Sequence, residues 1–258
     1  MRSWGLEVLR SCLPAVAIGK ARSWGSGRWL PVIAAVLVAS SACGSSLEVL
    51  TAGRDGPPTL VLLHGYGSSA QEWMPFTQSI VWPGRFVFPQ GLERTERPGG
   101  RAWWPLELGS AEDGLPDLAQ SRPKGLTSAA AAVGGLLNGF WWRRAHIVLG
   151  GFSQGAMVAS DVAFRSTARL SALVLLSGTP VDEASWRRGY AARRGLPVFI
   201  AHGRDDAVLP FSGSERMQRD LAASGLRVTW VPFDGGHEIP AEVVIALNQF
   251  LRSVREGS

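Results

Sequence analysis

The feature that most constrains this chain is a serine set between glycines, where a predicted strand meets a predicted helix. The segment Gly151-Phe152-Ser153-Gln154-Gly155 follows His146-Ile147-Val148-Leu149, an apolar run short and β-branched enough to be a buried strand. It precedes residues 156–165, whose pattern has helical spacing. Glycines on both sides of a tight turn let the strand and helix backbones approach each other. The chain is therefore expected to hold a serine hydroxyl on a sharp turn above a sheet.

The same segment has the G-x-S-x-G pattern of the nucleophile elbow in α/β-hydrolases. An ordinary hydroxyl is a poor nucleophile, so it needs a base to take its proton and amides to stabilise the oxyanion that forms. We predict that Ser153 is this nucleophile. The alternative is a glycine-rich turn with a purely structural role.

Strand and helix patterns alternate along the rest of the chain, which is typical of a mostly parallel sheet covered on both faces. With 258 residues, 46% of them hydrophobic, the chain can bury the core of one such domain. We predict an α/β fold of the α/β-hydrolase type without a large separate cap domain. The expected strands lie at residues 48–52, 59–63, 85–88, 146–149, 170–178, 196–201 and 227–233.

The N-terminal region has the pattern of an export signal. The apolar stretch at residues 30–39 is about as long as a signal-peptide core and shorter than the ~20 residues of a membrane-spanning helix. Small residues precede Cys43 and Gly-Ser-Ser follows it, which resembles a bacterial lipoprotein signal with a lipidated cysteine. We expect residues 1–43 to be a leader that is removed or disordered, and 44–258 to be the domain of an exported bacterial protein. The protein would lie on the periplasmic side or at the cell surface, anchored by a lipid on Cys43. The alternative is a cleaved secretory signal, in which case Cys43 has no role.

The charge distribution argues against nucleic-acid binding, and the spacing of the histidines argues against a metal site. The chain has a net charge of +5, but residues 1–43 hold five basic residues and one acidic residue, which leaves 21 basic and 20 acidic residues in the remainder. A domain this close to neutral offers no electrostatic footprint for nucleic acid, so we predict no such partner. The four histidines show no H-x-x-x-H spacing, so no metal or other cofactor is expected.

The base of the reaction can be chosen by chain order, since this fold places its triad as serine, acid, histidine. His64 and His146 precede Ser153, and His202 lies at the end of a predicted strand, before the acid candidates Asp205 and Asp206. His237 follows them all, in a Gly-Gly-His turn that can bring an imidazole to the serine. We predict His237 as the base and His64 as a residue that buttresses its loop.

Three carboxylates compete for the role of triad acid. Asp205 and Asp206 are neighbours on an extended segment, so their side chains point to opposite sides. Asp182 follows the preceding predicted strand. The acid must accept the Nδ1–H of His237, which fixes the tautomer and stabilises the imidazolium.

Two further segments are assigned to the substrate side. The loop after residues 59–63 supplies one oxyanion amide in this fold, and the residue after the nucleophile supplies the other, so the N–H groups of Tyr66 and Gln154 are the candidates. Residues 92–125 form a long stretch without periodicity, which is typical of a lid or binding loop. Trp103 and Trp104 in its middle are expected to form a wall of an apolar acyl pocket or to fill the core.

Five ordered motifs resemble the phospholipase/carboxylesterase family, which includes acyl-protein thioesterases and small bacterial carboxylesterases. They cover about residue 60 to the C-terminus and are His64-Gly65-Tyr66-Gly67, Arg101-Ala102-Trp103-Trp104, Gly151-Phe152-Ser153-Gln154-Gly155, His202-Gly203-x-x-Asp206-x-x-Leu209-Pro210 and Gly236-His237-Glu238-Ile239. The resemblance implies Ser153 as nucleophile, Asp206 as acid and His237 as base, oxyanion amides from Tyr66 and Gln154, and an acyl site near Trp103-Trp104.

The sequence departs from the family pattern at Ala156, Trp104-Pro105 and Leu209. The second departure lies in the substrate loop, so the resemblance does not imply an acyl specificity. We predict a serine hydrolase of carboxylic esters with a small-molecule ester or acyl substrate, acting through an acyl-enzyme. The alternatives are a thioesterase, a lysophospholipase, a dienelactone hydrolase-like enzyme, a polyester or feruloyl esterase, or a non-catalytic lipoprotein that uses the fold for binding.

Overall fold

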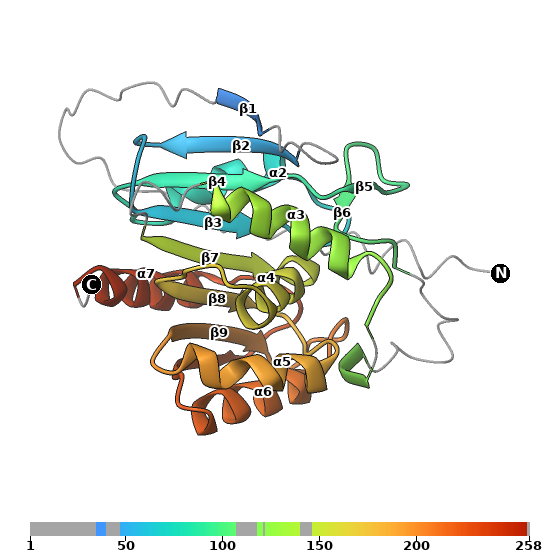
Figure 1. Ribbon diagram of the computed structural model, residues 1–258, viewed down its shortest axis with the longest axis vertical. Helices are drawn as coiled ribbons and strands as arrows, with labels where there is room; N and C mark the ends of the chain where they lie inside the picture. The colour runs from blue at the N-terminus through green and yellow to red at the C-terminus, as the bar shows by residue number, and fades with distance from the viewer. Residues whose placement is uncertain (1–34, 40–46, 107–117, 121, 140–145, 257–258) are drawn as a thin grey trace.

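A single large sheet organises the chain (Figure 1). The computed structural model describes residues 35–39, 47–106, 118–120, 122–139 and 146–256. Eight strands pair in the order β1-β2-β4-β3-β7-β8-β9-β10; β2 runs antiparallel to β1 and β4, and the other pairs are parallel. The strands are β1 (Ala35–Ala39), β2 (Leu47–Gly53), β3 (Thr59–Leu63), β4 (Arg85–Pro89), β7 (Ile147–Phe152), β8 (Ala172–Leu176), β9 (Pro197–Gly203) and β10 (Arg227–Phe233). The predicted mostly parallel α/β architecture is confirmed.

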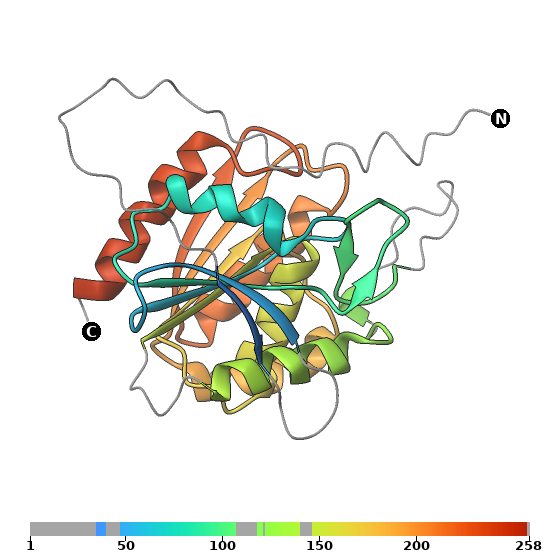
Figure 2. The ribbon, with the colours of Figure 1, turned by 90° about the horizontal axis from the view of Figure 1, so that it is seen from above.

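Helices cover both faces of the sheet, as the view from above shows (Figure 2). One face carries α3 (Leu126–Asn138), α4 (Gln154–Arg165), α5 (Glu183–Tyr190) and α6 (Phe211–Ala223). The other face carries α2 (Ala70–Trp73), the 3₁₀ turn η2 (Met74–Gln78) and α7 (Ala241–Glu256). Two further 3₁₀ turns are η3 (Leu118–Gln120) and η5 (Ala191–Arg193).

The central strands are apolar because the sheet is covered on both faces. Every residue of β3, β7 and β8 is buried, as expected for parallel strands with helices on each side. Alternate side chains of these strands enter two separate cores, one beneath α3 to α6 and one beneath α2 and α7. This rigid sheet places the carboxyl ends of β3, β7, β9 and β10 at one edge, which is where ligands bind in open α/β sheets.

Part of the predicted leader pairs with the sheet. Residues Ala35–Ala39 form β1, which pairs antiparallel with β2 at the sheet edge. Cys43 lies outside the described residues, as does most of 1–43. The assignment of 1–43 as a leader stays a prediction.

The segment 92–125 contains more regular structure than its sequence indicated. Its first part forms a small antiparallel hairpin of β5 (Glu93–Arg94) and β6 (Arg101–Ala102), and its last part contains η3. Residues 107–117 lie outside the described part of the chain. Of the described helices, none is long and apolar enough to cross a membrane.

Candidate active site

Ser153 occupies a strained turn between β7 and α4. Its backbone has φ 54° and ψ −120°, a conformation that costs a non-glycine residue about 1–3 kcal/mol and persists only where its surroundings enforce it. The Ser153 amide donates to the carbonyl of Leu176 at 2.9 Å, which ties the turn to the end of β8. A side chain at Gly155 would collide with the carbonyl oxygens of Leu63 and His64, at 2.3 and 2.6 Å from its Cβ. The glycine therefore lets α4 begin directly above the end of β3.

A buried carboxylate–imidazole pair lies at the same edge of the sheet. His237, in the loop after β10, has its Nδ1 2.7 Å from Oδ2 of Asp206, in the loop after β9. Gly203, at the end of β9, permits this approach, because a Cβ there would lie 2.3 Å from the carbonyl oxygens of both Gly235 and Gly236. Both side chains are almost completely buried. The geometry is that of an acid that orients a base.

Asp206 stays ionised because several donors converge on it. Its Oδ1 accepts the backbone amides of Val208 and Leu209 at 2.9 and 2.8 Å. Burial acts to raise the pKa of Asp206, but hydrogen bonds from His202 and His237 and the amide of Leu209 outweigh it and hold this pKa well below its usual range. The carboxylate is therefore available as an acceptor for the His237 Nδ1–H at neutral pH.

His202 is a contact of this carboxylate that the sequence analysis missed. Its Nε2 lies 3.1 Å from Asp206 Oδ2 and 3.0 Å from the carbonyl oxygen of Leu209. Both neighbours are acceptors, so Nε2 carries a proton. The other nitrogen, Nδ1, lies 2.7 Å from Ser214 Oγ. The signal in the sequence that could have found this contact was a histidine at the end of a predicted strand, four residues before the acid.

The second nitrogen of His237 is uncommitted. Among the described residues, Nε2 of His237 is buried and has no hydrogen-bond partner. Its ring packs on Phe152, the neighbour of Ser153, with ring centroids 4.8 Å apart. The imidazole thus lies beside the strained turn, with one nitrogen bound to Asp206 and the other without a hydrogen-bond partner among the described residues.

The two amides predicted to stabilise an oxyanion belong to segments that adjoin Ser153. Within the part of the chain that the structure describes, neither Tyr66 N–H nor Gln154 N–H donates a hydrogen bond. Tyr66 is half-buried, whereas Gln154 is buried, and buried amides are nearly always paired. The loop that carries Tyr66 contacts the serine, since a Cβ on Gly65 would lie 3.3 Å from the Cβ of Ser153.

His64 buttresses this loop, as predicted. Its Nε2 accepts the amide of Gly91 at 2.9 Å, so Nδ1 carries the proton and donates to the carbonyl of Gly65 at 2.8 Å. Burial is the main cause that lowers the pKa of His64 to about 4. The ring is therefore neutral at physiological pH and unavailable as a base.

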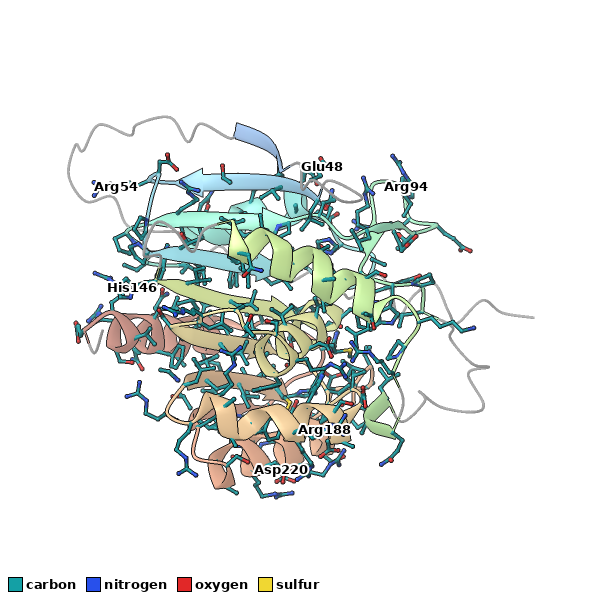
Figure 3. The ribbon with its side chains drawn as sticks, viewed as in Figure 1. Glu48, Arg54, Arg94, His146, Arg188 and Asp220 are labelled. Atoms are coloured by element: carbon teal, nitrogen blue, oxygen red, sulfur yellow. The ribbon has the colours of Figure 1, made fainter. Side chains whose placement is uncertain are left out.

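The side chains of the remaining candidates do not contact His237. Asp205 is exposed, and Asp182 contacts Arg122 and Arg165 at 3.3 and 3.2 Å. His146 precedes β7, at the edge of the sheet opposite the carboxyl ends of the parallel strands (Figure 3). Of the three carboxylates left open by the sequence, Asp206 is the one in contact with His237.

Trp103 and Trp104 lie in the core. Each is 1% exposed and belongs to the cluster beneath α3 and α4. Of the two roles predicted for this pair, the burial of both side chains supports core filling. No group of three or more potential metal-ligating side chains gathers anywhere in the described residues.

A model of the phospholipase/carboxylesterase family matches residues 45–255. The chain belongs to this family. Acyl-protein thioesterase 1 of Yarrowia lipolytica is 26% identical over 195 residues, which is 69% of this chain and 82% of that protein. The crystal structure of esterase PE8 superposes with a TM-score of 0.69 at 27% identity, over 81% of this chain and 99% of that one. Acyl-protein thioesterase 2 of Zea mays has a TM-score of 0.66 at 21% identity, over 80% and 98%, and shows the shared fold.

Membership of the phospholipase/carboxylesterase family confirms the predicted α/β-hydrolase fold and the predicted esterase-type hydrolase. The family also implies a small-molecule ester or acyl substrate.

Proposed function

We propose that this protein hydrolyses carboxylic esters through an acyl-enzyme, with Ser153 as nucleophile, His237 as base and Asp206 as the orienting acid. The observation that carries the proposal is the buried His237–Asp206 pair, 2.7 Å apart, at the sheet edge where Ser153 sits on a strained turn. A protein that merely binds ligands has no need of this combination.

In the proposed reaction, Ser153 Oγ attacks the ester carbonyl while Nε2 of His237 takes the hydroxyl proton. The tetrahedral oxyanion accepts hydrogen bonds from the N–H groups of Tyr66 and Gln154. Asp206 stabilises the imidazolium by accepting a hydrogen bond from its Nδ1–H. The carbon–oxygen bond to the alcohol then breaks, and His237 returns the proton to the departing alkoxide. A water molecule repeats the cycle on the acyl-enzyme: His237 takes its proton, hydroxide attacks, and Ser153 leaves reprotonated with release of the acid.

The decisive test combines a fluorophosphonate probe with p-nitrophenyl ester hydrolysis. We expect Ser153→Ala to abolish labelling and to lower kcat by at least about 10⁴-fold, and His237→Ala to lower kcat by a comparable factor, because triad members act as a unit. Circular dichroism serves as the control that both variants fold. Turnover within about tenfold of the wild type in either variant contradicts the assignment.

Thioesters are the second candidate substrate class. Relatives in Yarrowia lipolytica and Eremothecium gossypii are named acyl-protein thioesterase 1, which supports testing thioester cleavage by the same mechanism. Comparing kcat/KM for an ester and a thioester with the same acyl chain distinguishes the two activities. Ser153→Ala must lose both if one site serves them.

We also propose that the protein is exported, with Cys43 lipidated. The support is the residue pattern around Cys43, which lies outside the described residues. Metabolic labelling with an alkyne fatty acid tests it in cells that express the wild type or Cys43→Ala. Equal labelling of the two chains contradicts lipidation, and recovery of both from the cytoplasm contradicts export.

A further inference from the structure

Trp103 is hydrogen-bonded to both elements that carry the proposed oxyanion amides. Its backbone N–H donates to Oε1 of the Gln154 side chain at 2.8 Å. Its indole Nε1–H donates to the carbonyl of His64 at 2.8 Å. Gln154 starts α4, whereas His64 directly follows β3 and precedes Tyr66 by two residues. One tryptophan therefore spans the two segments between which an oxyanion would be held.

Both polar atoms of the Gln154 side chain have hydrogen-bond partners. The side-chain Oε1 of Gln154 accepts from Trp103, and its Nε2 donates to the carbonyl of Trp104 at 2.9 Å. Gln154 is 2% exposed, so these bonds are shielded from water and a lost partner would leave a buried polar group unpaired. The side chain of Gln154 is thus held in one orientation directly beside the amide proposed to face the oxyanion.

The contacts on the Tyr66 side orient a specific peptide plane. Gly65 C=O and Tyr66 N–H belong to the same planar peptide group, so a bond that fixes the oxygen also fixes the N–H. That oxygen accepts Nδ1–H of His64 at 2.8 Å, and Trp103 in turn holds the carbonyl of His64 and packs its ring 5.4 Å from the imidazole. The indole N–H thus fixes one peptide of the turn and the residue that orients the next.

Backbone pairing attaches Trp103 to the same loop. Gly67 N–H donates to the carbonyl of Arg101 at 2.9 Å, and Arg101 N–H donates to the carbonyl of Ser68 at 2.8 Å. These two bonds tie Arg101, two residues before Trp103, to the oxyanion loop, which gives the indole a defined approach to His64.

We propose that Trp103 is a positioning residue, which fixes the oxyanion hole by joining the Tyr66 turn to the Gln154 side chain; this rests on the proposed roles of those two amides. Pre-set donors are effective because they need no reorganisation as charge develops. Loss of a Trp103 hydrogen bond at either segment displaces an oxyanion amide without removing it. The consequence is weaker binding of the tetrahedral state, while binding of the planar ester changes little.

The test is Trp103→Phe, which keeps an aromatic ring and deletes the indole N–H. We expect kcat for p-nitrophenyl butyrate to fall about 10- to 100-fold with KM within about twofold, since small displacements of catalytic groups have effects of this size. The inhibition constant of phenylboronic acid, which forms a tetrahedral adduct with an active-site serine, should rise by a similar factor. Gln154→Met, which keeps the backbone amide and removes both side-chain bonds, should reproduce this pattern.

Trp73→Phe is the matched control. Trp73 is also buried, and its Nε1 has no partner among the described residues, so the same chemical change removes no bond. We expect its kcat, KM and boronate affinity to stay within about twofold of the wild type.

Three outcomes overturn the proposal: kcat of Trp103→Phe within about twofold of the wild type, an increase in KM alone, or an equal loss in Trp73→Phe. An increase in KM alone would indicate an acyl-pocket wall, and an equal loss would indicate core packing. Failure of the proposed function is a separate result, because it appears as an unlabelled wild type and an active Ser153→Ala.

Discussion

At the scale of single residues, His64 connects the stability of the fold to pH. Both ring nitrogens are used, one as acceptor from Gly91 N–H and one as donor to Gly65 C=O. Burial lowers the pKa of His64 from 6.5 to about 4. The unfolded chain therefore binds a proton more readily than the folded chain between these two values, and stability falls as the pH drops through this window.

We expect the free energy of unfolding to decrease by up to about 3 kcal/mol between pH 6.5 and pH 4 through His64 alone, because one pKa unit corresponds to about 1.4 kcal/mol. His64→Asn keeps a donor near Gly65 and cannot titrate, so its stability should depend less steeply on pH in this range. Urea unfolding at several pH values measures both slopes. Comparison at pH 8 isolates the packing cost of the substitution, and equal slopes in the two chains would contradict the role of His64.

The role of a residue was predictable from the sequence where chain order or a local motif decides it. It was not predictable where the role depends on contacts between residues far apart in the chain. Chain order and the Gly-Gly-His turn selected His237, and the structure places it against Asp206. The bonds of Trp103 depend on His64 and Gln154, which lie 39 and 51 residues away. An aromatic pair in a polar loop carries no sign of such partners, so core and pocket remained open alternatives until the packing was known.

At the scale of elements, a charged network joins α4 to its neighbours. Asp161 on α4 is 2% exposed and accepts both terminal nitrogens of Arg122, at 2.7 and 2.8 Å, and Nε1 of Trp186 on α5 at 2.9 Å. The same Arg122 reaches Asp182, whose amide donates to Leu118 C=O in η3. The network thus anchors η3 and the segment before α3 against the helix that follows Ser153.

Because Asp161→Asn removes the buried charge that Arg122 and Trp186 bond and leaves the partly buried Arg122 with Asp182 alone, we expect it to destabilise the fold by about 2–3 kcal/mol. The double variant Asp161→Asn/Arg122→Leu should lose less than the two single changes together, since it leaves no unpaired charge. Urea unfolding of the four chains completes the cycle. The control is Arg219→Ala, whose partner Glu215 and own side chain are largely exposed, with an expected cost within about 1 kcal/mol. Strictly additive changes would show that the buried pair is not coupled.

Element type was predictable because burial pattern and spacing decide it. Strand β3 matches the prediction at residues 59–63, and β10 at 227–233. The hairpin of β5 and β6 was not expected, because each strand has two residues and so too few positions to show alternation. Strand β1 was assigned to a signal core because its apolar residues fit either role; its pairing with β2 has no local sequence signal.

At the scale of the whole molecule, the order of strands separates the candidate site from the N-terminal region. The site residues follow β3, β7, β9 and β10, whereas β1 lies at the far edge of the sheet, beyond β2 and β4. The family model begins at residue 45, two residues before β2. The sheet from β2 onward thus contains every element that positions Ser153, Asp206 and His237.

We therefore expect a chain of residues 45–258 to fold and to keep kcat for p-nitrophenyl butyrate within about twofold of the full chain, because none of the bonds described for the site involves β1. Its melting temperature should fall by a few degrees, since β2 loses its antiparallel partner and becomes an edge strand. The same truncated chain with Ser153→Ala serves as the control for background hydrolysis. An insoluble truncated chain, or a fall in kcat of more than about tenfold, would make β1 an integral part of the catalytic domain and contradict the assignment of residues 1–43 as a leader.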